Sequence, residues 1–181
     1  IITKNGKKRA MLLHYPRNHS GYETGEPIAS YGTSPKPEGW VTYQEFLELT
    51  ENSEKQYELI DGVLYLMASP GLSHQRILGN LYSMFRLFFQ DNQSCDAFLS
   101  PFDIDLIRDS IRRKREPTED DINVVQPDLL VLCDYWDQIN EKDKFKGIPS
   151  LVGEILSPSP RSKDKVKKMD LYRDGGVGEF W

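Results

Sequence analysis

Three apolar, strand-like segments in the second half of the chain constrain its fold most strongly. They span residues 97–106, 124–133 and 151–156. Strands that are apolar along their length need cover on both faces of the sheet. Residues 73–90 and 162–173 have the pattern and boundaries of helices that can provide this cover. The sequence therefore predicts an α/β (α+β) fold with a central mixed β-sheet flanked by helices.

The first half of the domain is expected to add a short helix and a β-hairpin. Thr42 and Glu45 have the spacing of a capping box, which begins a helix. Residues 57–67 contain two β-rich runs joined by Asp61 and Gly62, a dipeptide that favours a tight hairpin turn. In the helix that follows, apolar residues recur at spacings of three and four and predict one buried face. That face would consist of Ile77, Leu81, Met84, Phe85 and Phe88.

The chain is expected to divide into an arm and one folded domain. Residues 1–39 are rich in Gly, Pro, Ser and Lys and have neither helical nor strand periodicity, so an extended N-terminal arm is predicted. The domain is expected to span residues 40–181, a length that supports a single hydrophobic core. The chain begins without a methionine and stops where a strand is expected to begin at Glu179. Its C-terminal end is therefore predicted to be truncated.

Composition limits the classes of protein that this chain can represent. With 28 acidic and 23 basic residues the net charge is −5, which argues against broad, non-specific binding to nucleic acid. The sequence has no run of about 18 apolar residues and no signal-peptide pattern, so no membrane partner is expected. Cys95 and Cys133 lie far apart and lack metal-binding spacing, so neither a disulfide nor a zinc site is predicted. Together these features predict a cytoplasmic protein.

Two carboxylates are expected in apolar surroundings. Asp128 begins one apolar strand, and Glu154 lies in the middle of another, where it shares a face with Val152 and Leu156. An unpaired buried carboxylate costs several kcal/mol or takes up a proton. The sequence therefore predicts a cation close to both acids.

Two cations could neutralise these acids, and they are compatible with each other. Mg²⁺ prefers one or two carboxylates together with water and phosphate oxygens, so Asp128 and Glu154 could bind it. Lys168 could also reach Glu154, because Asp164, Lys168 and Tyr172 are spaced by four residues and share one helix face. Without a metal ion, Glu154 and Lys168 would form an ordinary buried ion pair.

Several motifs follow one another within residues 40–181. They comprise 57–62 (Tyr-Glu-Leu-Ile-Asp-Gly), Ser69-Pro70, His74, Pro127-Asp128, 154–159 (Glu-Ile-Leu-Ser-Pro-Ser), Asp164, Lys168, Tyr172, 175–177 (Gly-Gly-Val) and 179–181 (Glu-Phe-Trp). In their order and spacing these motifs resemble the Uma-type restriction-endonuclease family, a branch of the PD-(D/E)XK nuclease superfamily. The resemblance implies a restriction-endonuclease-like core with Mg²⁺ or Mn²⁺ as cofactor. In that core Asp128 and Glu154 would bind the metal ion.

One position departs from the superfamily pattern. The lysine that stands two residues after the second acid is replaced here by Leu156, and Lys168 on the next helix resembles its relocated equivalent.

The resemblance also implies that Glu58 faces the site as a metal ligand or water-positioning acid; the alternative is a solvated strand carboxylate. His74 lies in the first turn of a helix, where a neutral ring could accept a proton or bind a phosphate-bound water. The alternative is a structural histidine.

Two further charged groups are expected to be structural. Asp103 and Asp105 share one face of a strand, which favours a polar sheet face over a metal site. The basic residues 112–115 are followed at once by acids, which favours a solvated loop with internal ion pairs.

The expected function is that of a Mg²⁺-dependent endonuclease that hydrolyses phosphodiester bonds in nucleic acid, with DNA as the expected partner. Cutting both strands needs two sites, so a homodimer is expected. One alternative is a catalytically silent protein that kept the nuclease fold and binds nucleic acid or has a structural role. Another is a hydrolase that uses Asp128 and Glu154 as paired carboxylates on a sugar. The basic residues 161–168 suit phosphate better than a glycoside.

Overall fold

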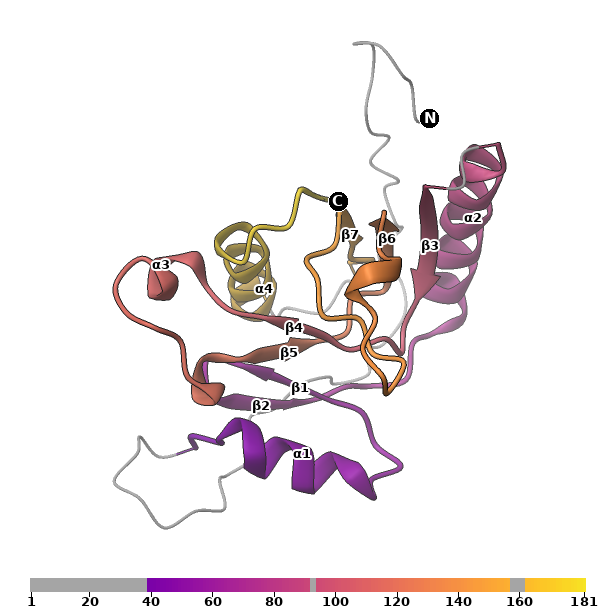
Figure 1. The fold of residues 1–181 in the computed structure, drawn as a ribbon. Helices are drawn as coiled ribbons and strands as arrows, with labels where there is room; N and C mark the ends of the chain where they lie inside the picture. Colours follow the sequence, from indigo (N-terminus) through magenta and orange to yellow (C-terminus); the bar gives the residue numbers. More distant parts are fainter. Residues whose placement is uncertain (1–38, 92–93, 157–161) are drawn as a thin grey trace.

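The computed structural model describes residues 39–91, 94–156 and 162–181, and for 162–165 the backbone alone (Figure 1). The helices are α1 (Tyr43–Glu51), α2 (Leu72–Phe89), α3 (Asp109–Arg112) and α4 (Ser162–Asp174), with 3-10 turns at Glu119–Asp121 and Trp136–Gln138. The strands are β1 (Tyr57–Ile60), β2 (Val63–Leu66), β3 (Cys95–Leu99), β4 (Ile104–Leu106), β5 (Asn123–Val125), β6 (Leu129–Cys133), β7 (Leu151–Gly153) and β8 (Glu179–Phe180). The predicted arm, apart from Gly39, lies outside the described residues and stays a prediction.

The described strands form two four-stranded sheets. The first has the order β2-β1-β5-β4 and is antiparallel throughout. The second has the order β3-β6-β7-β8, in which only β8 runs parallel to its neighbour β7. The prediction of an α/β protein with sheets flanked by helices is confirmed, but the prediction of one central sheet is wrong.

Prolines lie at the points where the predicted strands break and the single predicted sheet is replaced by two. The predicted strand 97–106 is divided into β3 and β4 by a break that contains Pro101, and the predicted strand 124–133 is divided into β5 and β6 by a break that contains Pro127. A proline has no N–H to donate to a strand neighbour, so it is excluded from the interior of a central strand. At each break the chain passes from one sheet to the other.

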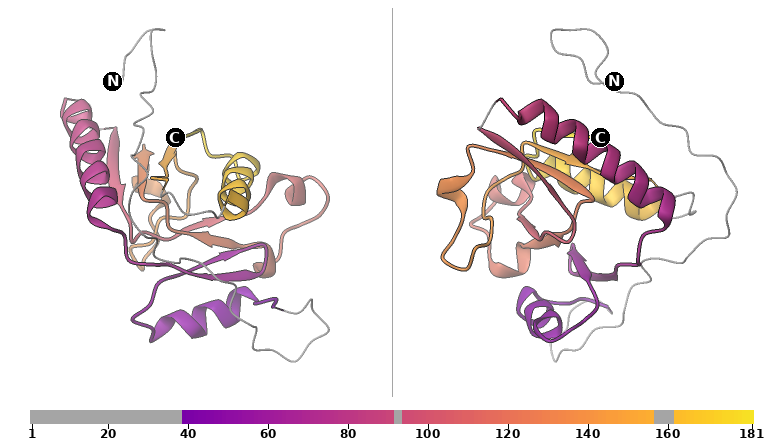
Figure 2. Two further views of the ribbon diagram at one scale, coloured as in Figure 1. Left: turned by 180° about the vertical axis from the view of Figure 1, so that it is seen from behind. Right: turned by 90° about the vertical axis from the view of Figure 1, so that its right-hand side faces the viewer.

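The layers are held together by three apolar clusters. The helix α1 packs on one side of the first sheet, and α2 lies along the second sheet (Figures 1 and 2). The largest cluster combines side chains of β4 and β5, side chains of β6 and β7, and Leu171 and Tyr172 of α4. Both α4 residues are at most 1% exposed. The helix α4 is therefore anchored where the two sheets meet.

The predicted helix start and hairpin are confirmed. Thr42 caps α1, and its hydroxyl and the Glu45 carboxylate form the reciprocal contacts of a capping box. Strands β1 and β2 pair antiparallel around Asp61 and Gly62, which have φ angles of 49° and 71°. Positive φ at both central positions is the geometry that an Asp-Gly hairpin turn requires.

The buried face of α2 differs from the predicted one. Its fully buried residues are Leu78 and Phe85, while Met84 and Phe88 are 43% and 50% exposed. The helix carries two neighbouring apolar stripes with the same alternation of four- and three-residue spacing. The stripe of Leu78, Tyr82, Phe85 and Phe89 packs on the second sheet, and of the neighbouring stripe of Ile77, Leu81, Met84 and Phe88 only Leu81 joins this cluster. Periodicity alone does not distinguish two apolar stripes with the same spacing.

The two cysteines form a disulfide, so the prediction of unpaired cysteines is wrong. Cys95 begins β3 and Cys133 ends β6, and the antiparallel register places them directly opposite each other with a Cα–Cα distance of 4.0 Å. Their separation of 38 residues in sequence carries no information about this register. The cytoplasmic prediction rested partly on unpaired cysteines and stays a prediction.

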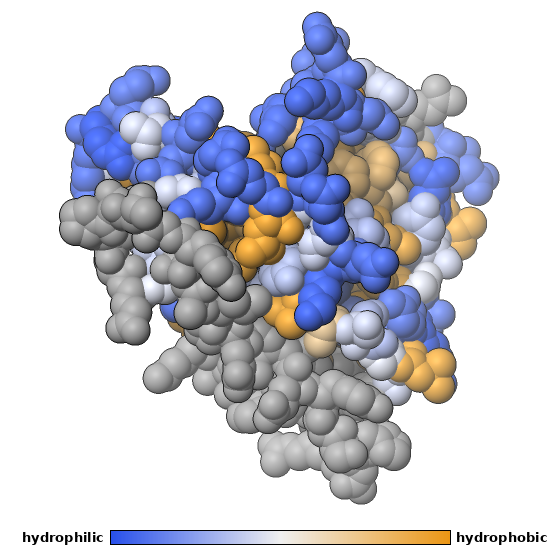
Figure 3. Space-filling view, turned by 90° about the horizontal axis from the view of Figure 1, so that it is seen from below, coloured by the Kyte–Doolittle hydropathy of each residue, from blue (hydrophilic) through white to orange (hydrophobic). Residues whose placement is uncertain are grey.

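The described surface on the side of α1 is mostly polar. Seen from the side of α1, hydrophilic residues dominate the described surface and apolar residues form separate patches between them (Figure 3). Among the helices of the described residues, none has the length and apolar character needed to cross a membrane.

Replacing Gly62 by alanine is expected to destabilise the fold by about 2 kcal/mol, from backbone strain and overpacking together. A Cβ atom at this position would lie 2.5 Å from the Trp40 ring, and the φ angle of 71° disfavours any side chain. The measurement is the midpoint of urea unfolding. Gly79→Ala is the matched control, because a Cβ there meets nothing within 4 Å on α2 and should leave stability equal or higher. Equal urea midpoints for Gly62→Ala and Gly79→Ala would contradict the close packing of the Trp40 ring on Gly62.

Candidate active site

The two predicted metal-binding acids lie next to each other where the sheets meet. In the antiparallel pairing of β6 with β7, Leu129 lies opposite Gly153, which places Asp128 beside Glu154 just beyond the end of both strands. The Asp128 Oδ2 atom accepts a hydrogen bond of 2.7 Å from the backbone N–H of Ile155. The Glu154 backbone N–H donates to the carbonyl oxygen of Trp181 at 2.9 Å. Hydrogen bonds with the backbone therefore hold both acids in place at the strand ends.

Side chains of α4 reach Glu154. The Oε1 atom of Glu154 lies 2.7 Å from Lys168 Nζ and accepts a hydrogen bond of 2.6 Å from the hydroxyl of Tyr172. Burial raises the pKa of Glu154, and the ammonium of Lys168 opposes this rise. Burial and the neighbouring Glu154 also raise the pKa of Tyr172 well above its usual value, so the phenol stays a donor. Lys168 thus reaches Glu154 as the helical spacing predicts, whereas the side chain of Asp164 lies outside the described residues.

Lys168 also contacts Glu58, so it bridges two acids. Its Nζ atom lies 2.9 Å from Glu58 Oε1, which in turn accepts a hydrogen bond of 2.8 Å from the backbone N–H of Gln126. Glu58 is only 7% exposed, so the alternative of a solvated strand carboxylate is wrong. Burial by itself would lower the pKa of Lys168, but Glu154 and Glu58 outweigh burial and raise it. The lysine therefore remains a cation.

His74 lies on the other side of Asp128. Its Nε2 atom is 3.1 Å from Asp128 Oδ2, and this hydrogen bond is the main reason that the pKa of His74 is raised. The position in the first turn of α2 had favoured a neutral ring, but the contact with the carboxylate dominates. The Nδ1 atom of His74 is buried and has no hydrogen-bond partner among the described residues. Asp128 thus connects the start of α2 with the end of β7.

Asp128 and Glu154 are the acids of this cluster whose chemistry suits a metal ion. Within the described residues no group of three or more His, Cys, Asp or Glu side chains has the geometry of a metal site. Among the described residues, Asp128 makes its side-chain contacts through Oδ2 and Glu154 through Oε1, and Mg²⁺ characteristically takes one or two carboxylates with waters completing its shell. Asp128 and Glu154 therefore have the chemistry to hold Mg²⁺ or Mn²⁺. Glu58, the third acid predicted as a metal ligand, contacts Lys168 and a backbone N–H, and its role as a ligand stays a prediction.

Asp105 and Arg115, two of the charged residues expected to be structural, are paired away from this site, whereas Asp103 accepts a hydrogen bond from Gln126 beside it. Asp105 contacts Lys146 and the Tyr43 hydroxyl, on the side of the first sheet that faces α1. Arg115 pairs with Asp121 through two bonds of 2.6 Å. These contacts agree with a polar sheet face and a self-paired loop.

Two polar residues of the site were not assigned a role from the sequence. Tyr172 was placed on the same helix face as Lys168, but its hydrogen bond to Glu154 could not be predicted without the position of α4. Gln126 donates its backbone N–H to Glu58 and its side-chain amide to Asp103 at 2.7 Å. The only sequence signal for Gln126 is its place directly before Pro127, at the break between the two sheets.

The fold and its acid–lysine cluster define a nuclease-like α/β domain. The chain belongs to the Uma2 family, described as "Putative restriction endonuclease", whose family model matches residues 43–181. The family resemblance seen in the sequence is thereby confirmed.

The chain is also similar to individual proteins. Two uncharacterised proteins of Synechocystis sp. are 28% and 24% identical to the chain over 145 and 133 residues, covering 80% and 74% of this chain and 67% and 68% of the relatives. A crystal structure from Anabaena variabilis, described as a "putative nuclease belonging to DUF820", matches with a TM-score of 0.58 and 22% identity. The match covers 78% of this chain and 72% of that one, and at this identity it shows a shared fold.

Proposed function

We propose that this protein is a metal-dependent endonuclease that hydrolyses phosphodiester bonds in DNA. The observation that carries the proposal is the adjacency of Asp128 and Glu154 at two strand ends, with the Lys168 ammonium 2.7 Å from Glu154. Acids and a cation gathered at one edge suit a phosphate substrate, because the acids can hold a metal ion and the cation can face a phosphoryl oxygen. Membership of a family described as restriction endonucleases supports the same reaction.

Each residue has a distinct proposed role. Asp128 and Glu154 would hold Mg²⁺ or Mn²⁺, which when bound polarises a phosphate oxygen and makes a bound water more acidic. Lys168 stabilises the negative charge that develops on the phosphate in the transition state. Glu58, in contact with Lys168, keeps the ammonium charged and in place. His74 orients the Asp128 carboxylate through its Nε2 atom.

The direct test is cleavage of supercoiled plasmid DNA by the purified protein with Mg²⁺, Mn²⁺ or EDTA. Cleavage that requires a divalent ion, and that a Glu154→Gln protein purified in parallel lacks, supports the proposal. An equal amount of cleavage by both proteins would identify a contaminating nuclease and refute it. Single-stranded DNA and RNA of the same sequence distinguish the substrate. Linear product formed without a nicked intermediate would indicate two cooperating sites, as in the expected homodimer.

A silent nuclease fold is the second candidate, and one observation favours it. Lys168 already bridges Glu58 and Glu154, so these two acids have a cation without any metal ion. A network closed in this way would give stability and no hydrolysis. The two candidates differ in metal binding: only the enzyme requires an ion at Asp128 and Glu154.

A further inference from the structure

The helix that carries Lys168 has few apolar anchors. Among the side chains described for α4, only Leu171 and Tyr172 are buried, while Val166 is 64% and Met169 is 41% exposed. Two apolar side chains at consecutive positions fix the depth of a helix better than its rotation or its shift along the axis. The placement of Lys168 therefore depends on polar contacts as well.

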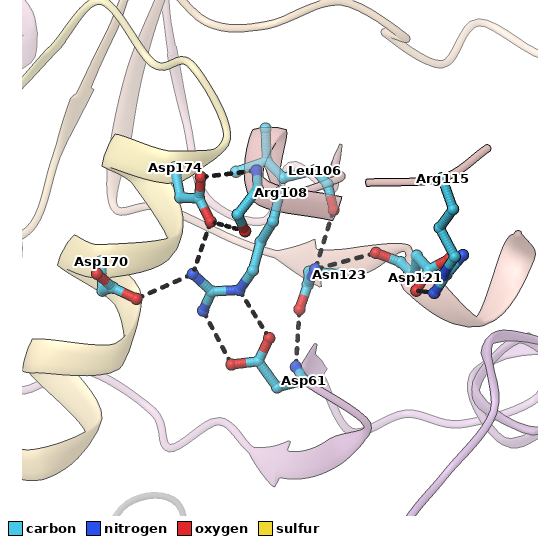
Figure 4. Close-up of polar contacts among 9 residues, drawn as sticks. Asp61, Leu106, Arg108, Arg115, Asp121, Asn123, Asp170 and Asp174 are labelled. Atoms are coloured by element: carbon cyan, nitrogen blue, oxygen red, sulfur yellow. Dashed lines mark hydrogen bonds and ion pairs between the residues drawn. The ribbon is translucent and has the colours of Figure 1, made fainter. Parts of the chain in front are cut away.

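Arg108 makes the most extensive of these polar contacts. Its Nε and Nη2 atoms each donate a 2.9 Å hydrogen bond to one oxygen of Asp61, in the turn between β1 and β2. Its Nη1 atom donates to Asp170 at 2.9 Å and lies 3.6 Å from Asp174. Figure 4 shows the guanidinium between the hairpin turn and α4. Although it touches three acids, Arg108 is only 12% exposed in its side chain.

Both ends of this bridge are themselves fixed. The Asp61 backbone N–H donates to Asn123 Oδ1 at 2.7 Å, and the Asn123 side chain donates to the Leu106 carbonyl oxygen at 3.1 Å. At the other end, Asp174 accepts hydrogen bonds from the backbone N–H and the hydroxyl of Ser110, at 3.1 and 2.5 Å. The bridge therefore runs from a rigid hairpin turn to the last turn of α4.

The bridge joins the two elements whose side chains meet in the site. Asp61 stands three residues after Glu58, and Asp170 stands between Lys168 and Tyr172. We propose that Arg108 is a positioning residue of the candidate active site, which sets the register of α4 so that Lys168 reaches Glu58 and Glu154. The expected effect of Arg108 on the cleavage rate rests on the proposed nuclease function. Its effect on the position of α4 does not depend on that function.

The geometry of the guanidinium group explains why arginine is needed at position 108. A guanidinium presents parallel N–H donors to one carboxylate and further donors to a second. A lysine at position 108 keeps the charge but cannot bond both oxygens of Asp61 and Asp170 in the same arrangement. Arg108→Lys thus removes the register-setting contacts without leaving three acids uncompensated.

The test compares Arg108→Lys with Arg112→Lys. Arg112 lies on α3 close in sequence, but it pairs with Asp109 of the same short helix. Two properties are measured on each protein: hydrogen–deuterium exchange of the α4 amides, and the single-turnover rate and DNA affinity with Mg²⁺. For Arg108→Lys we expect faster exchange in α4 and a rate lowered about tenfold or more, as for a small displacement of a catalytic group. DNA affinity and the values for Arg112→Lys should match the wild type.

The outcomes separate the two proposals. Unchanged exchange in α4 of the Arg108→Lys protein would overturn the positioning role, whatever the activity. If the α4 amides of Arg108→Lys exchange faster but the wild-type protein cleaves no DNA, the positioning role is supported and the nuclease function is rejected. A loss of DNA affinity with an unchanged rate would also overturn the inference, because it would place Arg108 in substrate binding.

Discussion

Asp128→Asn is expected to lower the rate of Mg²⁺-dependent DNA cleavage by roughly 10³-fold, the scale of losing a main source of transition-state stabilisation. The substitution removes the negative charge that a hard metal ion requires. It keeps the shape of the side chain and an oxygen that can accept the Ile155 N–H, which Asp128 accepts at 2.7 Å. The fold should therefore persist while activity is lost. Single-turnover cleavage of a labelled duplex measures the rate, and thermal unfolding checks the fold.

Asp137→Asn is the matched control for charge, because Asp137 lies in the 3-10 turn Trp136–Gln138 and not in the acid–lysine cluster. It should cleave at the wild-type rate. Wild-type cleavage by Asp128→Asn would remove Asp128 from the proposed metal site. If Asp128→Asn also unfolded at a much lower temperature, the loss of activity would have a structural cause instead.

Lys168→Met is expected to have the second largest effect, on stability as well as on activity. The variant leaves Glu58 and Glu154 without the cation that contacts both, and breaking such a buried pair costs about 3 kcal/mol. Methionine keeps most of the chain length, so a cavity contributes little. Cleavage should fall by roughly 10²-fold because the ammonium acts on the phosphate charge. Urea unfolding and single-turnover kinetics measure the two effects.

The pH dependence of this variant has a defined sign. Burial already raises the pKa of Glu154 in the folded protein, so the folded carboxyl holds a proton more tightly than the unfolded one. Its contribution to stability is present at low pH and is lost as the pH rises through the interval between the ordinary and the raised pKa. Removing Lys168 takes away the charge that opposed the rise and widens this interval. Lys168→Met should therefore be less destabilising at pH 5 than at pH 8.

A second substitution separates the charge effect from a simple loss of packing. Glu58→Gln in the Lys168→Met background removes one of the two uncompensated acids, so the double variant should be more stable than Lys168→Met alone. Additive losses from the two substitutions would mean that Lys168 and Glu58 do not interact in solution, contrary to their 2.9 Å contact.

Several elements could be predicted from sequence because their signals are local. The capping box at Thr42, the Asp-Gly turn and the helix before Gly175 all rest on contacts within a few residues. The division into two sheets could not be predicted in the same way, although Pro101 and Pro127 mark the breaks. A proline shows where pairing stops but not which strands the chain joins next.

The site was predictable to the extent that it lies at strand ends, although Glu154 was expected in the middle of a strand and β7 ends at Gly153. Asp128 and Glu154 stood out because carboxylates in apolar runs need a cation, and the β6–β7 register places them side by side. The bridge from Lys168 to Glu58 depends on where α4 crosses the first sheet, which no spacing encodes. The same applies to Cys95 and Cys133, whose pairing is set by a strand register, and to the side of α2 that is buried.

The most direct test of a metal-dependent nuclease is anomalous diffraction from crystals grown with Mn²⁺. The proposed function predicts an anomalous peak within bonding distance of the carboxylates of both Asp128 and Glu154, and no peak there in Asp128→Asn crystals. Wild-type crystals without a peak at these acids, with Lys168 still bridging Glu58 and Glu154, would contradict it and identify a closed ion-pair network in a silent nuclease fold.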